Sequence, residues 1–475
     1  MAAGTAINRI LALILSWVIA VSPVIPEAES SARTFSAGSV SCRVTESAGA
    51  LGPAVINHRV YDFEDAQILM IRAEGSPGSE GPFAVCFYEE EVEADGCHIW
   101  YPGEDGRWVD TPAKEGFIRT GTVCIRTGGR TVMISLPQAY EDVGRSVYRC
   151  MSEYKGFLSI EKSCSGLVIK VIGICPEGAS CHGMIFTGRD FSPAFGDDNC
   201  AVLWDRYLSD GTARWLFEGY CRVIPGRYEP NVEGGYYLCP ACFIAQVMAE
   251  KIGTCPEAPY LALACWDTQA MQQSEEGFWK TGARSVWLYE DYGIEEGFYD
   301  TRFNTDLIET GLYINEKLGG SFGKDAVRRY AGFYTSYAYR SHRQTESGGW
   351  LIPDYTGPGQ RTAAHTSLNH QAAECRCLYR MAEFLDDPGL IPLADRLLEG
   401  ILDTSEGWIR EDHDLHYSVS AEGEFSGKDY ERLTYDDLVQ LAGLLEDMGR
   451  PADQRLTRLI EEKRLWMRAR GIEDL

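Results

Sequence analysis

Aromatic rings and charged side chains recur in the predicted loops of the C-terminal half of this chain. Those that we single out as candidate substrate contacts are Trp350, Tyr355, Trp408, Arg410 and Tyr417. Aromatic rings give sugars apolar faces to stack on, and neighbouring carboxylates bind hydroxyl groups or move protons. The combination is typical of a carbohydrate cleft. Rings of this kind can also close the mouth of a helical barrel without touching a ligand, so that interpretation stays open.

A further polar group stands at the start of a predicted helix. Ser367 is suited to cap that helix, but capping does not explain the polar residues Asn369, His370 and Gln371 that follow. Polar groups gathered at a helix start are well placed to meet a ligand. We therefore expect Asn369 and Gln371 to bind a substrate and His370 to take part in catalysis.

Several acidic residues have a structural explanation as well as a chemical one. Asp300 precedes a helix predicted over 302–318 and can cap it, and Asp306 lies where a negative charge favours the helix dipole. Asp197 and Asp198 can cap another helix in the same way. Asp197 and Asp198 could instead serve a glycosidase site, because such sites use two carboxylates.

The C-terminal part of the sequence has a helical period. Apolar residues recur at helical spacing between polar caps and Gly or Pro stops. The predicted helices cover 302–318, 364–385, 390–402, 434–448 and 452–469. Consecutive helical hairpins suit a closed or partly closed barrel, so we expect an α/α toroid over 190–475.

The N-terminal part has the pattern of short strands. Apolar runs at 67–71, 83–88, 131–136 and 166–172 are separated by clusters of Gly, Pro, Ser and Asp. Short strands between turn signals predict a sheet domain, which we place over 35–180. The expected fold class is α+β with several domains: a β-rich, sandwich-like domain followed by the toroid.

The first residues have the character of a targeting segment. Arg9 precedes an apolar run over 10–24, and Ser30-Ser31-Ala32 fits a cleavage site. The run is short for a membrane span. We expect a signal peptide over 1–32 and a secreted or extracytoplasmic protein, with a retained N-terminal anchor as the alternative.

The composition limits the partners of this protein. The 475 residues include 70 acidic and 44 basic side chains, which give a net charge of −26. Such a surface repels phosphate backbones, so we expect no nucleic-acid partner. The same field opposes a polyanionic substrate unless a local basic cleft overrides it. The sequence does not indicate an oligomeric state.

The 16 cysteines could form disulfides, bind a metal or remain buried thiols. Export permits disulfides. Cys239 and Cys242 form a CxxC pair, but the second half of a zinc site lacks such a pair and a histidine at ligand spacing. His413 and His416 flank acids in what resembles an exposed loop. We therefore expect no metal site.

The C-terminal quarter of the chain resembles the α/α domain of the D-glucuronyl C5-epimerases. The family has a Gly-Gly-Trp-Pro loop, two helices and an aromatic loop ending in Glu-Glu-Tyr-Pro before an apolar helix. Here the first loop reads Gly348-Gly349-Trp350 with Pro353 displaced, and Asp429-Tyr430 precedes the last helix. A second register, on the family's Asp-Tyr-His-Thr-Thr-His, also places a tyrosine on Tyr430. A looser similarity to other toroid carbohydrate-active enzymes extends to 189–193 and 196–199.

The resemblance implies C5 epimerisation of a uronic acid in a polysaccharide, without a cofactor. This chemistry needs a base on one face of the sugar ring, an acid on the other, and a cation or donor that stabilises the enolate formed from the carboxylate. The resemblance makes Asp429 and Tyr430 the proton-transfer groups, with Arg302, His370 or Arg410 near the substrate carboxylate. The alternatives are a toroid glycoside hydrolase or polysaccharide lyase, and a non-catalytic glycan- or cell-wall-binding protein.

Overall fold

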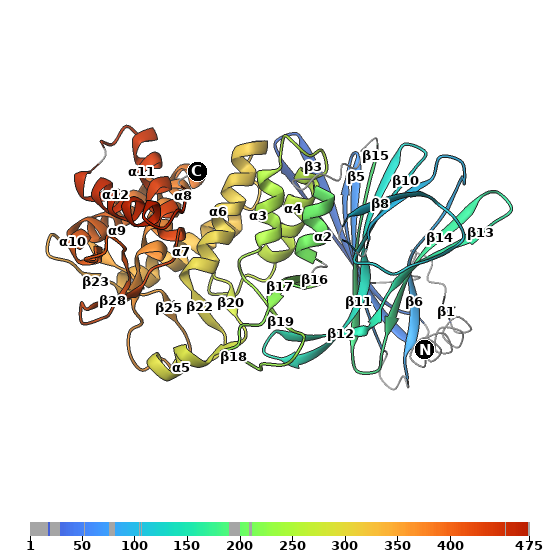
Figure 1. Ribbon diagram of the computed structural model, residues 1–475, viewed down its shortest axis with the longest axis horizontal. Helices are drawn as coiled ribbons and strands as arrows, with labels where there is room; N and C mark the ends of the chain where they lie inside the picture. The colour runs from blue at the N-terminus through green and yellow to red at the C-terminus, as the bar shows by residue number, and fades with distance from the viewer. Residues whose placement is uncertain are drawn as a thin grey trace. The chain divides into compact units, whose positions relative to one another are not determined.

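The structure is a computed structural model of the chain. It describes residues 29–473 apart from 52, 76–80, 104, 106, 190–199, 209–210 and 452, together with the short strand Val18–Ile19. The chain forms two compact units: unit 1 is Met1–Gln269 with Ile314–Phe322, and unit 2 is Ala270–Tyr313 with Gly323–Leu475. Strands dominate unit 1 and helices dominate unit 2 (Figure 1), so the chain has the mixed α and β content that the sequence predicts.

Unit 1 is built around a 13-stranded sheet. Its strands are β2 Glu29–Ala37, β3 Val40–Leu51, β4 Ala54–Phe63, β5 Ala66–Gly75, β7 His98–Pro102, β8 Trp108–Pro112, β10 Thr122–Thr127, β11 Arg130–Gly144, β12 Val147–Lys155, β15 Ser180–Arg189, β16 Ala213–Leu216, β17 Gly219–Val223 and β19 Gly235–Leu238. The order along the main path is β16-β17-β19-β12-β11-β15-β5-β4-β3-β2, and β10, β7 and β8 extend from β11.

A second sheet of five strands packs against the first. Its strands, in spatial order, are β1 Val18–Ile19, β6 Phe83–Val92, β14 Leu167–Cys175, β13 Phe157–Lys162 and β9 Gly116–Ile118. Side chains of both sheets form one apolar core; Ile71, Phe87 and Val171 are each at most 5% exposed in it. Alternation of apolar residues along the strands directs one face of each sheet inward.

Helices cover the other face of the large sheet within unit 1. They are α2 Cys200–Leu208, α3 Phe243–Glu250 and α4 Ala258–Ala270, and the short strand β18 Tyr228–Glu229 lies between α2 and α3 in the chain. Tyr61 and Phe63 of β4 face away from the apolar core because side chains alternate along a strand. The Phe63 ring contacts Tyr260 of α4 at 4.9 Å, and the Tyr61 hydroxyl donates to Asp267 at 2.8 Å.

Unit 2 is mainly helical. Its helices are α5 Val286–Tyr292, α6 Thr301–Leu318 (whose last residues belong to unit 1), α7 Lys324–Ser341, α8 Leu368–Leu385, the 3-10 turn η1 Pro388–Leu390, α9 Ile391–Asp403, α10 Ser405–Trp408, α11 Leu433–Asp447 and α12 Gln454–Arg468. Helix α8 packs against α7, α9 and α11, and α11 packs against α12. The first turns of α8 bury polar as well as apolar side chains, among them His370, Gln371 and Glu374.

Short strands tie the loops of unit 2 together. They are β20 Lys280–Thr281, β21 Arg284–Ser285, β22 Phe298–Asp300, β23 Arg343–Gln344, β24 Trp350–Leu351, β25 Tyr355–Thr356, β26 Thr366–Ser367, β27 His416–Val419 and β28 Phe425–Lys428. Strand β22 pairs with β25 and leads directly into α6, while β26 pairs with β27 and leads directly into α8. The starts of two helices are therefore fixed by strand pairing.

Most of the predicted helices and strands are confirmed as individual elements. The five predicted C-terminal helices correspond to α6, α8, α9, α11 and α12, and the four predicted strands fall in β5, β6, β11 and β14. The closure of the unit 2 helices into a toroid, and the boundaries at 35–180 and 190–475, stay predictions. The predicted signal peptide over 1–32 lies outside the described residues except for Val18–Ile19 and the start of β2, and the predicted caps Asp197 and Asp198 lie outside them too.

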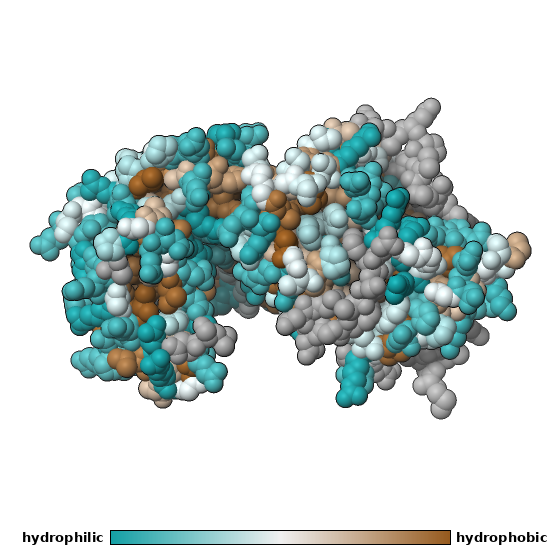
Figure 2. All heavy atoms as spheres, turned by 90° about the horizontal axis from the view of Figure 1, so that it is seen from above, coloured by the Kyte–Doolittle hydropathy of each residue, from teal (hydrophilic) through white to brown (hydrophobic). Residues whose placement is uncertain are grey.

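The structure also bears on the cysteines, on membrane-spanning helices and on the surface charge. All 16 cysteines belong to the described part, where each is a free thiol. Within the same part of the chain, no helix is long and apolar enough to cross a bilayer. Hydrophilic side chains dominate the face drawn in Figure 2, in line with the net charge of −26.

Candidate active site

A fully buried carboxylate lies at the centre of the candidate site in unit 2. Asp354 stands directly before β25 and is 0% exposed. Its Oδ1 accepts from the Ser367 backbone N–H at 2.9 Å, and its Oδ2 accepts from the Ser367 hydroxyl at 2.6 Å. Burial acts to raise the pKa of Asp354, but His370, His365 and the Ser367 hydroxyl outweigh it and hold that pKa below its usual value. Asp354 is therefore ionised at neutral pH.

Ser367 occupies the predicted N-cap position of α8, but its hydroxyl makes no cap hydrogen bond. The hydroxyl donates to Asp354 instead. The prediction of its place is confirmed, and the predicted capping contact is wrong, because a buried carboxylate is the stronger acceptor for that proton.

Two histidines face the Asp354 carboxylate. Its Oδ2 lies 3.3 Å from Nε2 of His365 and 3.7 Å from Nδ1 of His370. Nδ1 of His365 lies 2.8 Å from the Tyr292 hydroxyl, and Nδ1 of His370 lies 2.7 Å from the Thr301 hydroxyl. Burial lowers the pKa of His370 to about 4, although Asp354 acts in the other direction, so its imidazole is neutral at pH 7. A carboxylate that orients an imidazole is suited to proton transfer.

Asp300 is the N-cap of α6, as its sequence position predicts. Its Oδ1 accepts from the Phe303 backbone N–H at 3.0 Å. It pairs with Tyr355 across β22 and β25, and the Thr301 N–H donates to the Asp354 carbonyl at 3.0 Å, so Asp354, directly before β25, lies beside the end of the strand that carries Asp300. Burial raises the pKa of Asp300 to about 7, and the charge of Asp354 adds to this. Two carboxyl groups with pKa values driven apart can act as acid and base.

A third carboxyl group lies one turn further along α8. Glu374 is 2% exposed and accepts a short hydrogen bond from the Tyr334 hydroxyl. Burial raises the pKa of Glu374 to about 8, so it is protonated at neutral pH. Among the residues that the structure describes, no group of three or more His, Cys, Asp or Glu side chains could hold a metal ion.

Aromatic rings surround His365 and continue to the surface. Trp287 stacks on its imidazole at 6.0 Å between ring centroids, and Tyr417 meets it edge-on at 5.5 Å. The Tyr417 ring contacts Tyr430 at 5.7 Å, and Tyr430 is 50% exposed. Burial raises the pKa of Tyr430, a hydrogen bond to Tyr417 acts against this, and Asp300 adds to it. Tyr430 is therefore the exposed end of a row of rings that begins at His365. Tyr355 and Tyr417 of this ring group, like Tyr430, are among the candidate site residues named from the sequence.

Asp429 has a different environment from the one predicted for a catalytic acid or base. It is 5% exposed, pairs with Lys463 at 2.9 Å and accepts from the Thr434 hydroxyl at 2.6 Å. Lys463 also contacts Asp414 at 2.6 Å and donates to the Tyr430 carbonyl at 2.6 Å. Asp429 is thus occupied in fixing the loop that carries Tyr430.

The two arginines expected near a substrate carboxylate have partners within the protein. Nε of Arg302 lies 2.8 Å from Asp306, and its Nη1 lies 2.5 Å from Asp437. Arg302 is near enough to His370 to help lower the pKa of that histidine. Arg410 lies 3.3 Å from Asp412 and donates to the Gly427 carbonyl at 3.1 Å.

Asn369 and Gln371 are both buried at the start of α8. The Gln371 side chain accepts from the Ile352 N–H at 3.0 Å and donates to the Trp350 carbonyl at 2.7 Å, so it holds the chain before β25. Asn369 is 1% exposed, and none of the described residues gives its Oδ1 a hydrogen bond. Gln371 therefore supports the backbone, while Asn369 keeps an unused acceptor.

Trp350 and Trp408 are not part of the ring group around His365. Trp350 stacks on His342 at 3.8 Å, and Gly349 before it lets the chain pass against the backbone of Gly400, where a Cβ atom has no room. Trp408 is 0% exposed, and its indole N–H donates to the Thr404 hydroxyl at 3.0 Å. The Gly-Gly-Trp motif and Trp408 therefore serve packing in unit 2.

Sequence reasoning did not select Asp354, His365, Trp287 or Tyr292 as site residues, and it explained Asp300 by capping alone. Their positions in the chain could have indicated them. Several of these residues stand just before, or at the end of, a short element close to α6 or α8. The pairing of β22 with β25, together with the hydrogen bond from the Asp354 N–H to the His365 carbonyl at 2.9 Å, brings these short segments together.

Comparisons with known proteins are loose. The sequence matches no protein-family model and no curated protein. Solved structures that align with it include a D-mannose isomerase (13% identity, TM-score 0.35, 47% of this chain and 58% of that one) and the unsaturated glucuronyl hydrolase of Bacillus sp. GL1 (17%, 0.33, 48% and 60%). A family 76 glycoside hydrolase from a bovine Bacteroides thetaiotaomicron strain aligns over 84% of this chain and 75% of its own, at 9% identity and a TM-score of 0.37. The chain thus spans 58% and 60% of the first two structures. These are carbohydrate-processing enzymes, and likenesses of this strength fix no activity for this chain.

Proposed function

We propose that this protein is a carbohydrate-active enzyme that moves protons at the Asp354 site, by which we mean Asp300, Asp354, His365, His370 and the rings around them. One observation carries the proposal: an ionised, buried Asp354 contacts two imidazoles, and aromatic rings lead from one of them to the half-exposed Tyr430. Rings give a sugar an apolar surface, and hydroxyl and imidazole groups beside them can exchange protons with it.

The groups have distinct roles in this proposal. Tyr430, Tyr417 and His365 contact the sugar and carry its protons. Asp354 orients His365 and stabilises its charged form, as a buried aspartate does for a catalytic histidine. Asp300, with a pKa of about 7, supplies a proton near neutral pH.

Within this class, epimerisation at C5 of a uronic acid is the reaction that we infer first. It needs a proton removed from one face of the ring and delivered to the other, and tyrosine, histidine and carboxyl groups can do both without a cofactor. The pairing of a protonated Asp300 with an ionised Asp354 favours a second reaction, glycoside hydrolysis, which uses one carboxyl group in each state.

The test is a product analysis in heavy water. Full-length protein is incubated with a panel of neutral and uronate-containing polysaccharides, and the products are followed by NMR. Deuterium at C5 without cleavage indicates epimerisation, new reducing ends indicate hydrolysis, and a new ring double bond indicates lyase chemistry. Binding without any of these changes contradicts the proposal and indicates a glycan-binding protein.

A matched pair of variants ties any turnover to this site. Tyr430→Phe deletes one hydroxyl beside Tyr417 and should abolish the reaction while leaving the melting temperature unchanged. Tyr154→Phe deletes a hydroxyl in unit 1 and should leave the reaction unchanged. Equal losses in both variants would remove the assignment to the Asp354 site.

We also propose that the protein is exported, because a short apolar run is followed by small residues at 30–32. N-terminal sequencing of protein recovered outside the cytoplasm tests this. We expect a first residue between 29 and 36, and an intact N-terminus in the membrane fraction contradicts the proposal.

A further inference from the structure

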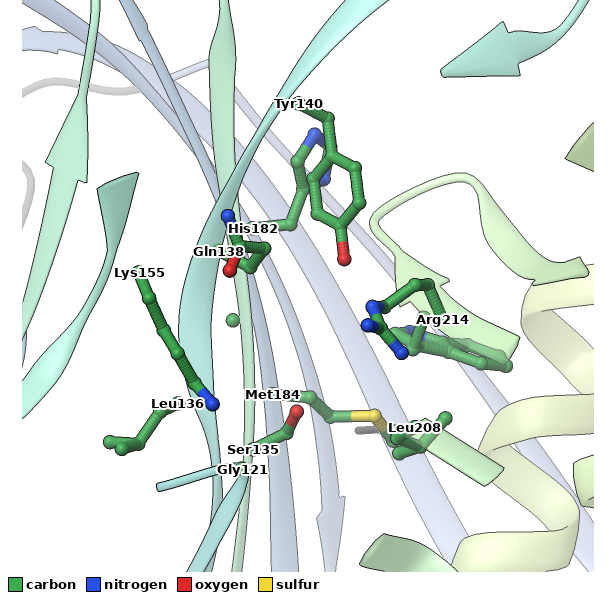
Figure 3. A pocket seen from close by; sticks show the side chains of 12 residues that line it. Gly121, Ser135, Leu136, Gln138, Tyr140, Lys155, His182, Met184, Leu208 and Arg214 are labelled. Carbon is green, nitrogen blue, oxygen red and sulfur yellow. The ribbon is translucent and has the colours of Figure 1, made fainter. Parts of the chain in front are cut away.

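A polar cavity in unit 1 is lined by two cationic side chains. Lys155, the last residue of β12, and Arg214 in β16 reach into the same space from opposite sides (Figure 3). Ser135, Gln138 and His182 add polar groups to the lining, and none of the described lining residues is acidic. The cavity volume of about 40 Å³ is roughly three times the minimum for one water molecule. It is therefore of a size for a small ion or a single charged group.

An irregularity of the sheet creates this cavity. The register between β11 and β15 shifts between Ser135 and Gln138, and the register between β11 and β12 shifts just beyond, between Gln138 and Tyr140. Pro137 lies within the first shift and has no backbone N–H to give to a neighbouring strand. A bulge bends a strand and redirects its side chains, and such bulges are common beside binding sites. Ser135 and Tyr140 thus both line a hollow that a regular ladder would close.

The two cations stand close without an ion pair. Neither Lys155 nor Arg214 forms a salt bridge with any residue in the described ranges. Burial lowers the pKa of Lys155, and the positive charge of Arg214 lowers it further, while Asp205 acts against both without cancelling them. Burial lowers the pKa of His182 to about 4, so this lining residue is neutral. In a chain of net charge −26, two neighbouring positive charges are a local exception.

A third donor finds no partner among the residues that the structure describes. Trp215 lines the cavity and is 7% exposed, and its buried indole N–H makes no hydrogen bond to any of those residues. An unsatisfied buried donor costs on the order of 1–3 kcal/mol. The centre of the Arg214 guanidinium lies 4.9 Å from the Tyr236 ring centroid. Arg214 gives one N–H to the Ala213 carbonyl at 2.7 Å and also hydrogen-bonds the Cys150 side chain, so the remainder of its five N–H groups stay available.

We propose that this cavity binds a small oxyanion, that is, a sulfate, phosphate or carboxylate group, between Lys155 and Arg214. The anion neutralises two repelling charges and accepts a hydrogen bond from the Trp215 indole. Charge-assisted hydrogen bonds of this kind are among the stronger ones in proteins. This site lies in unit 1, and the inference does not rest on the function proposed for unit 2.

The experiment measures anion binding to the full-length protein by calorimetry at constant ionic strength, because screening by salt weakens such contacts. Sodium sulfate, inorganic phosphate and sodium acetate are the three probes. We expect saturable binding of one anion per chain, and the preference among the probes identifies the sulfate, phosphate or carboxylate source. Absence of saturable binding for all three probes overturns the proposal.

A pair of lysine variants locates the bound anion. Lys155→Met should weaken binding at least tenfold, whereas Lys162→Met, at an exposed position of β13 with the same charge change, should bind like the wild type. Trp215→Phe should weaken binding severalfold. Equal affinity of Lys155→Met and the wild type overturns the assignment.

Stability gives an independent readout. Without added anion, Lys155→Met should melt no lower than the wild type, because it removes one of two repelling charges. Anion should raise the melting temperature of the wild type and Lys162→Met but not of Lys155→Met. If Lys155→Met does not fold, selenate soaked into wild-type crystals decides by its anomalous signal: a peak between Lys155 and Arg214 supports the site, and a peak elsewhere or none overturns it.

Discussion

Replacement of Asp300 by asparagine separates its two roles. Asn caps a helix as well as Asp does, so Asp300→Asn should keep the acceptor for the Phe303 N–H and leave α6 intact. The substitution removes an ionisable group from a buried position, since Asp300 is 5% exposed. The variant therefore tests whether the fold holds this carboxyl group in its neutral form.

The size of the effect follows from the raised pKa. Burial moves the pKa of Asp300 from 3.8 to about 7, which corresponds to roughly 4 kcal/mol of unfolding free energy. Because the folded-state pKa is the higher one, the stabilising contribution is fully present below pH 3.8 and is lost as the pH rises through 7. Asp300→Asn does not lose stability in this way, because an amide does not ionise. It should match the wild type near pH 4 and exceed it by up to about 4 kcal/mol at pH 8, or roughly 8 °C or more in melting temperature.

The assay is thermal unfolding followed by circular dichroism at intervals from pH 4 to pH 8.5. Asp453→Asn is the control, because Asp453 caps α12 with its side chain and its pKa is lowered, chiefly by a hydrogen bond with Arg455. That control should gain nothing at high pH. A difference between Asp300→Asn and the wild type that does not change with pH would refute the reasoning.

Three further outcomes follow from buried groups of unit 2. Glu374→Gln should raise the melting temperature at pH 9 but not at pH 5. The pKa of Glu374 is about 8 in the folded protein, so the wild type loses stability as the pH rises from 4.5 through 8, and the variant does not. Glu383→Gln, at an exposed position of the same helix, should show no such gain in the same melts. Lys463→Met should cost about 3–5 kcal/mol in denaturant unfolding, since it leaves Asp414 and Asp429 buried without their cation; a loss below about 1 kcal/mol speaks against this. As the pH falls from 7 to 4, the folded protein should lose stability, because the low pKa of His370 makes the unfolded chain bind a proton at a higher pH than the folded chain does. His370→Gln should show a flatter pH dependence in parallel melts, and an unchanged slope contradicts the prediction.

The helices of unit 2 could be predicted because their signals are local. Asp300 caps α6 where the sequence places a cap, and Gly319 ends that helix in the left-handed conformation that glycine adopts readily. Such signals lie within a few residues of the element that they define. The boundaries of α9 and α12 were within two residues of their predicted positions for the same reason.

The candidate site could be predicted only in part, because long-range pairing assembles it. Asp354 and Asp300 are brought together by strands of two and three residues, which are too short to leave an alternating pattern in the sequence. Tyr417 and Tyr355 could be named as candidates because aromatic residues in loops are conspicuous, and Tyr430 could be named through the family resemblance; contact of all three with a substrate stays a prediction. Asp429 looked equally suitable, but its partner Lys463 comes from α12, where a lysine in sequence is indistinguishable from an exposed one.

The central claim is that Asp354 orients imidazoles that move protons on a carbohydrate. The measurement that tests it most directly is the pH–rate profile of Asp354→Asn beside the wild type, on a carbohydrate from the panel that the wild type converts. The account predicts a kcat lower by about 10²–10⁴, a changed pH profile, a nearly unchanged KM and a folded variant. A variant that keeps the wild-type kcat and pH profile, or a wild type that converts no carbohydrate in the panel, would contradict it.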